Sequence, residues 1–177
     1  MSSICSGDKQ GEYDGGIKPG NDRSGLHFVK YGGEAIFVAR GAGPWPVLAA
    51  FFKVSCPTCQ YTFPFLQRIY EAHGSKNVAI VGISQNDRKD TAAFLKQYGV
   101  TFPVLLDDTR SYPASNAYGL THVPSIFWIA PDGEIEIASI GWSRKDIEEF
   151  SRHAAGDPNR APALFLPGEQ VSDFRAG

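Results

Sequence analysis

The sequence predicts a single α/β domain in which helices cover a central β-sheet. Its 177 residues suit one hydrophobic core, since such cores are normally complete below about 250 residues. Hydrophobic residues make up 42% and charged residues 20%, as in soluble globular proteins. Residues 46–54 form a nearly continuous apolar run, which indicates a central strand buried on both faces. Beyond this run, segments typical of strands and of helices alternate, which is the pattern of an α/β fold.

A β-hairpin is expected before the central strand. Residues 26–31 and 34–40 are rich in β-branched and aromatic side chains and flank Gly32 and Gly33, as in two strands joined by a tight turn. After the central strand we expect a helix from Pro57 to about residue 73 or 74, because proline suits the first helical position. Pro64 lies inside this helix and predicts a kink there.

The remaining elements follow from spacing, turn and capping signals. Apolar runs predict the strands, and residues three or four apart predict the helical faces. In chain order we expect a strand at 78–83, a helix at 88–98, a strand at 104–106, a helical turn at 111–118, a strand at 125–129, a hairpin turning at 131–133, and a last helix that begins with the capping pair Ser143 and Asp146 and ends near Gly156.

The ends of the chain read differently from its middle. Residues 1–24 are rich in glycine and almost without apolar side chains, which predicts a mobile N-terminal arm. Residues 25–156 would form the domain. Residues 157–177 contain three prolines and are expected to be an irregular tail in which only Leu164, Phe165 and Leu166 dock.

Charge and hydropathy exclude several classes of protein. Seventeen Lys and Arg against 19 Asp and Glu leave a formal net charge of -2, and no basic stripe is present, so no nucleic-acid partner is expected. No apolar run approaches the roughly 20 residues that span a bilayer. The first 16 residues lack the features of a secretory leader, which predicts a cytoplasmic location unless a leader has been removed.

The most informative feature is the motif Cys56-Pro57-Thr58-Cys59. At the start of a helix, unpaired backbone amides and the helix dipole favour a thiolate at the first cysteine. Cys56 is therefore the candidate nucleophile. Cys59, one helical turn further on, could attack a mixed disulfide at Cys56, so it is the candidate resolving thiol.

The alternatives for these cysteines are a metal site and two inert, packed thiols. A zinc site would need a second cysteine pair or histidines at finger spacing, and the sequence has neither. A protein that carries Cu(I) could bind it with both thiols and His122. We expect His122 to be a solvated loop residue instead. Lys53 could favour a thiolate at Cys56, but a lysine at a strand end usually extends to water. Cys5 reads as a free thiol in the arm.

The sequence resembles the thioredoxin fold, and within it the TlpA-like and AhpC/TSA redoxin branch. The resemblance is carried by residues 49–66 around the cysteine motif, by VAIVGIS at 78–84, and by YGLTHVPSIFWIAPDG at 118–133. It implies a three-layer sandwich with a central mixed β-sheet and, between residues 78 and 108, a strand-helix unit that minimal thioredoxins lack.

The resemblance also implies a role for Val123 and Pro124. It predicts a cis bond before Pro124, packed opposite the dithiol, with the backbone of Val123 offered to an extended substrate segment. This chain departs from the family pattern at other positions. Ser55 replaces the usual Trp before the first Cys, and Ala50 and Thr62 stand where relatives place an acid. The usual proton acceptor for Cys59 is therefore missing from both places.

Peroxidase chemistry is the alternative function. Peroxiredoxins often have Cys-Pro-Thr at the reactive cysteine, as at 56–58 here, and Cys56 could then become a sulfenic acid that condenses with Cys59. Their pattern also has Thr or Ser three residues before that Cys and Pro seven before, where this chain has Lys53 and Ala49.

The predicted function is thus thiol-disulfide exchange through Cys56 and Cys59. The expected partners are a protein or small-molecule disulfide and a thiol or thioredoxin-type electron donor. Neither a cofactor nor a bound metal is expected. The neighbouring acids Asp107 and Asp108 do not share a face of a strand or helix, so we expect them to be solvated charges rather than a catalytic pair.

Overall fold

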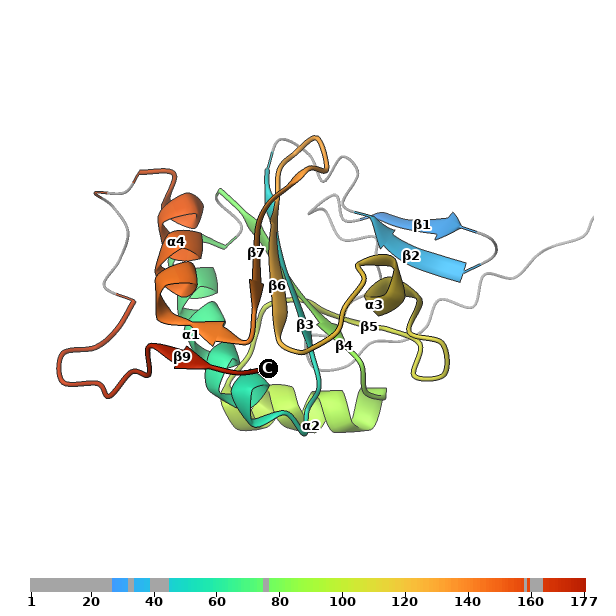
Figure 1. The fold of residues 1–177 in the computed structure, drawn as a ribbon, viewed down its shortest axis with the longest axis horizontal. Helices are drawn as coiled ribbons and strands as arrows, with labels where there is room; N and C mark the ends of the chain where they lie inside the picture. The colour runs from blue at the N-terminus through green and yellow to red at the C-terminus, as the bar shows by residue number, and fades with distance from the viewer. Residues whose placement is uncertain (1–26, 32–33, 39–44, 75–76, 158, 160–163) are drawn as a thin grey trace, which may run out of the picture.

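A five-stranded mixed β-sheet forms the centre of the protein in the computed structural model (Figure 1). The structure describes residues 27–31, 34–38, 45–74, 77–157, 159 and 164–177, the first two ranges by their backbone alone. The strand order is β5-β4-β3-β6-β7. The strands are β3 (Val47–Phe52), β4 (Ala79–Ser84), β5 (Val104–Leu106), β6 (Ser125–Ile129) and β7 (Ile135–Ile140).

Strand β3 lies in the middle of this sheet. It pairs in parallel with β4 and antiparallel with β6, and all six of its residues are buried. The continuous apolar run is thus explained by cover on both faces, and the predicted central strand is confirmed.

Helices cover both faces of the sheet (Figure 1). Buried side chains of α1 (Pro57–His73), α2 (Arg88–Tyr98) and α4 (Arg144–Ala155) share one core with the sheet, and α3 (Pro113–Ala117) contributes to a second core on the opposite face. The predicted α/β arrangement and its element order are confirmed. Helix α1 continues through Pro64, so a bend at that residue stays a prediction.

The hairpin predicted before the sheet is also present. Strands β1 (His27–Tyr31) and β2 (Glu34–Val38) pair antiparallel, with Tyr31 opposite Glu34. In Figure 1 this hairpin lies on the side of α3, apart from the central sheet. The predicted mobile arm at 1–24, with Cys5, lies outside the described residues.

Aromatic rings fill the core beneath α1. The ring of Phe63 lies with its centroid 4.3 Å from that of Phe52, 5.4 Å from Phe94 and 5.7 Å from Phe102. On the other face Phe51 packs against Tyr118, and burial raises the pKa of the Tyr118 hydroxyl to about 12. These contacts show the aromatic residues packed against one another in the core.

Asp107 corrects one expectation from the sequence. Its side chain is 4% exposed rather than solvated. The carboxylate accepts hydrogen bonds from the backbone N–H groups of Ala114 and Ser115 and from the Ser115 hydroxyl, at 2.7–3.0 Å. Asp107 thereby satisfies the unpaired amides at the start of α3, whereas Asp108 is exposed as expected.

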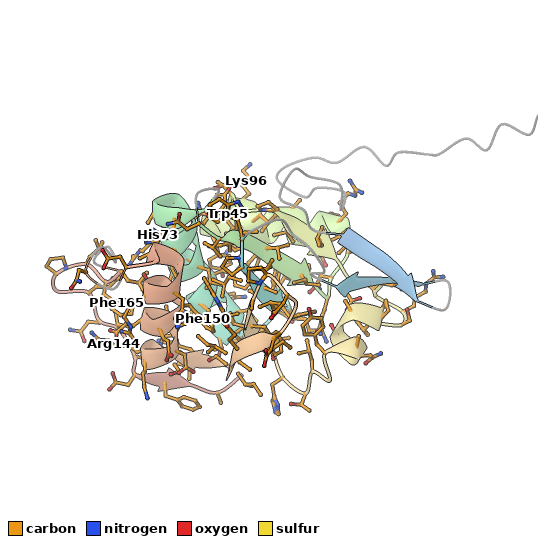
Figure 2. The ribbon with its side chains drawn as sticks, turned by 90° about the horizontal axis from the view of Figure 1, so that it is seen from above. Trp45, His73, Lys96, Arg144, Phe150 and Phe165 are labelled. Atoms are coloured by element: carbon orange, nitrogen blue, oxygen red, sulfur yellow. The ribbon has the colours of Figure 1, made fainter. Side chains whose placement is uncertain are left out.

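The last residues dock more extensively than the sequence predicts. Strand β9 (Phe174–Arg175) pairs antiparallel with β8 (Trp142–Ser143), directly before α4. Leu164 is buried and Phe165 half-buried, but Leu166 is 60% exposed, so its predicted docking is wrong. Arg144 lies against the Phe165 ring, 4.9 Å from the ring centroid, at the start of α4 (Figure 2).

No helix within the described ranges has both the length and the apolar character needed to cross a membrane.

Candidate active site

The loop between β3 and α1 places the first cysteine. Asn86 Oδ1 accepts a hydrogen bond from the Val54 amide at 3.0 Å, and the Gln60 side chain donates one to the Val54 carbonyl at 2.8 Å. The Cys56 amide donates to the Lys53 carbonyl at 3.2 Å. Hydrogen bonds at Val54 and at Cys56 therefore fix the loop after β3, and with it the position at which α1 begins.

Cys56 is the residue that caps the N-terminus of α1. Its backbone is extended, with φ -80° and ψ 116°, and its sulfur accepts a hydrogen bond from the Cys59 amide at 3.3 Å. Pro57 occupies the first helical position, as predicted. Cys56 is half-buried, and its sulfur is held at the start of the helix by the Cys59 amide.

Cys59 lies behind Cys56, inside the core. Its side chain has no exposed surface, and burial raises the pKa of the Cys59 thiol well above its ordinary value. Both cysteines are free thiols in this structure. The motif therefore presents a half-buried cysteine and, one helical turn away, a buried cysteine whose thiol is held in its protonated form.

Val123 and Pro124 meet the dithiol from the opposite side. The Cys56 thiol donates a hydrogen bond to the Val123 carbonyl at 3.3 Å, across 67 residues of sequence. The peptide bond between Val123 and Pro124 is cis, as the resemblance predicts. The Pro124 carbonyl accepts the Gly141 amide at 2.8 Å, which ties this loop to the end of β7. The structure thus brings all four predicted site residues together.

The two positions where relatives carry an acid provide no proton acceptor for Cys59. Ala50 is buried in β3, and the buried Thr62 donates its hydroxyl to the Thr58 carbonyl at 2.7 Å. Among the described residues, the only titratable side chain that contributes to the pKa shift of Cys59 is Cys56.

The side chains of Lys53 and His122, the two further candidates from the sequence, make contacts with residues other than the cysteines. The Lys53 ammonium lies over the Tyr112 ring, 5.9 Å from its centroid. His122 is exposed and its ring nitrogen lies 3.0 Å from the Thr121 hydroxyl. No group of three or more His, Cys, Asp or Glu side chains able to hold a metal occurs in the part of the chain that the structure describes.

A contact that the sequence did not reveal joins the motif to the end of the chain. The Thr58 hydroxyl, between the two cysteines, donates a hydrogen bond of 2.6 Å to the Ala176 carbonyl. Figure 1 shows this end of the chain beside the first turns of α1. The acceptor is a backbone carbonyl, which any residue supplies, so no residue type in the sequence signals the contact.

Comparison with known proteins agrees with this geometry. The model of the AhpC/TSA family matches residues 30–138. The chain belongs to the AhpC/TSA family. Among curated members, the thiol-disulfide oxidoreductase ResA of Bacillus subtilis is 30% identical over 122 residues, which are 67% of this chain and 65% of the relative. ResA of Halalkalibacterium halodurans is 27% identical over 59% of each chain.

Solved structures show the same fold for this AhpC/TSA chain. The crystal structure of StoA from Bacillus subtilis is 26% identical, with a TM-score of 0.51 over 60% of this chain and 82% of that one. A thioredoxin family thiol:disulfide interchange protein from Chlorobium tepidum is 23% identical, with a TM-score of 0.55 over 65% and 81%. The predicted thioredoxin-like fold is confirmed. The chain spans 59% of the length of the Halalkalibacterium halodurans ResA and 65% of the length of the Bacillus subtilis ResA.

Proposed function

We propose that this chain is a thiol-disulfide oxidoreductase, with Cys56 as nucleophile and Cys59 as resolving thiol. The observation that carries the proposal is the position of the half-buried Cys56 at the start of α1, where its sulfur accepts a hydrogen bond from the Cys59 amide and the Cys59 side chain is buried. The activity named for the ResA relatives supports it. Val123 and Pro124 line the substrate side of Cys56.

The reaction is an exchange of one disulfide for another. The Cys56 thiolate attacks one sulfur of the substrate disulfide, forms a mixed disulfide and releases the other sulfur as a thiolate. Cys59 then loses its proton and attacks the Cys56 sulfur, which releases the second substrate thiolate and leaves a Cys56–Cys59 disulfide. Two electrons pass to the substrate, and the two thiolates take up the two protons. A thiol or thioredoxin-type donor reduces the protein again, and every step is reversible.

A redox titration tests whether the two cysteines form one couple. The purified protein is equilibrated in glutathione buffers of stepped potential, and free thiols are trapped and counted by mass spectrometry at Cys56 and Cys59 separately. We expect both thiols to disappear together, with one midpoint and a two-electron slope. That midpoint distinguishes a reductant from an oxidant. Absence of a Cys56–Cys59 disulfide at every potential would contradict the resolving role.

Peroxide reduction is the second candidate, favoured by the Cys56-Pro57-Thr58 triplet at the start of α1. Cys56 would attack a hydroperoxide, become a sulfenic acid, and condense with Cys59 to give the same disulfide and water. The Thr58 hydroxyl already donates a hydrogen bond to the Ala176 carbonyl. Lys53 also occupies the position at which the peroxiredoxin pattern has Thr or Ser. We therefore expect hydrogen peroxide to oxidise the protein no faster than it oxidises free cysteine, as measured by the loss of thiols. Faster oxidation of the protein would favour the peroxidase function over this expectation.

A further inference from the structure

The segment formed by residues 172–177 lies across the dithiol side of the protein. The Ala176 carbonyl accepts the Thr58 hydroxyl at 2.6 Å. A Cβ placed on Gly177 would lie 2.9 Å from the Val123 carbonyl oxygen and 3.3 Å from the His122 Cβ. The same Val123 oxygen accepts the Cys56 thiol. The backbone of the segment therefore lies against the group that borders the reactive sulfur.

Several contacts hold this segment in place where it begins. The Trp142 indole N–H donates to the Ser172 carbonyl at 2.6 Å, and the Tyr61 hydroxyl accepts the Ser172 amide at 3.0 Å. The Arg175 guanidinium lies over the Tyr61 ring, 3.7 Å from the ring centroid. Trp142 is fully buried, so these contacts connect the segment to the core rather than to other surface groups.

A second anchor lies upstream of the segment. Arg68 on α1 donates two hydrogen bonds of 2.8 Å to the Glu169 carboxylate and one of 2.9 Å to the Leu164 carbonyl. Together with the Leu166 amide, Arg68 lowers the pKa of Glu169 to about 2. The ion pair between Arg68 and Glu169 is therefore formed at neutral pH. It fixes the position of the chain that leads into residues 172–177.

The segment packs so closely against residue 141 that only glycine fits at that position. Gly141 has φ +77°, and a Cβ there would lie 2.5 Å from the Arg175 carbonyl oxygen and 2.9 Å from the Gly177 nitrogen. Both the positive φ and the close approach exclude a side chain at this position. The chain between β7 and β8 is thus shaped to accept the segment.

We propose that residues 175–177 narrow the approach to Cys56 and make the protein select small-molecule disulfides over disulfides within extended polypeptides. An extended polypeptide binds an exposed backbone edge by main-chain pairing, and the Val123 edge is the one that Gly177 lies against. Such a substrate has to displace the segment first. A small disulfide needs only to reach the half-buried Cys56. This inference rests on the proposed exchange activity.

The test uses two variants that loosen the segment from outside the dithiol. Gly177→Ala places a methyl group against the Val123 oxygen, and Arg175→Ala removes the guanidinium from the Tyr61 ring. Gln170→Ala is the matched control, because Gln170 is an exposed residue that follows the Glu169 anchor. The assay compares kcat/KM for reduction of insulin with kcat/KM for bis(2-hydroxyethyl) disulfide. Thermal unfolding monitored by circular dichroism identifies any variant that has lost its fold.

We expect both loosening variants to raise the insulin-to-small-disulfide ratio at least fivefold, and the control to change it less than twofold. An unchanged insulin-to-small-disulfide ratio in a folded variant would overturn the proposal. A lower ratio would also overturn it, because it would mean that the segment helps to bind polypeptide substrates. A second readout does not depend on turnover. The ratio of Cys56 alkylation rates with polymer-linked maleimide and with iodoacetamide should rise in the same variants. If the wild type reduces neither disulfide but this alkylation ratio rises, the exchange activity fails while the narrowing stands.

Discussion

Replacing Cys56 by serine should abolish disulfide exchange. A hydroxyl at this position is a far weaker nucleophile than a thiolate and cannot form the mixed disulfide, so kcat/KM for insulin and for small disulfides should fall by at least about 100-fold. Serine keeps a polar atom that can accept the Cys59 amide at the helix start, so the fold should be retained. The measurement is insulin turbidity together with absorbance of the released small thiol; turnover above a tenth of the wild-type rate would refute the proposed nucleophile.

Cys59→Ser is the matched variant, because it leaves the attacking sulfur in place. The first step should proceed and the second should not, so the protein should accumulate as a stable mixed disulfide at Cys56, visible by mass spectrometry. In the wild type the resolving step needs the Cys59 thiolate, and burial raises the pKa of that thiol. The decay rate of the mixed disulfide should therefore increase with pH, by up to about tenfold per unit while Cys59 remains mostly protonated. A flat profile between pH 6 and 9 would contradict this assignment.

Much of the fold could be predicted from the sequence, because its elements carry local signals. The helix that the sequence predicts at 88–98 is observed as Arg88–Tyr98; Asp87 before it accepts the Asp90 amide as a cap, and Gly99 ends it with φ +64°. Ser143 likewise accepts the Asp146 amide. The Asp146 carboxylate also accepts a hydrogen bond from the Ser139 hydroxyl. Ser139 lies on β7, and a local sequence pattern does not reveal this partner.

The parts that sequence did not reveal depend on backbone groups and on distant partners. Asp107 reads like any surface acid, yet the chain folds back so that two amides of α3 reach its carboxylate. The docking of residues 172–177 uses the carbonyls of Ser172 and Ala176. Every residue has a carbonyl, so these contacts leave no trace in composition or spacing. The dithiol is recognisable from the sequence because cysteine is rare and its spacing carries a chemical meaning.

The largest expected loss of stability comes from Phe63→Ala. The Phe63 ring is fully buried between Phe52, Phe94 and Phe102, and truncating such a ring removes its packing and leaves a cavity. The free energy of unfolding should fall by about 3–5 kcal/mol. Urea unfolding followed by fluorescence gives this value. Phe174→Ala is the control, because that ring is 67% exposed and its removal should change stability by no more than about 0.5 kcal/mol.

The same substitution should also change the chemistry of the site. Cys59 and Phe63 are four residues apart on α1 and therefore share a face of the helix, and both belong to one buried cluster. We expect loss of the Phe63 ring to loosen the packing of this cluster around Cys59, and so to weaken the desolvation that raises the pKa of its thiol. At neutral pH the mixed disulfide at Cys56 should then resolve faster in Phe63→Ala than in the wild type, although the variant is less stable. A slower or equal rate in protein that is still folded would show that burial beside Phe63 does not control the Cys59 proton.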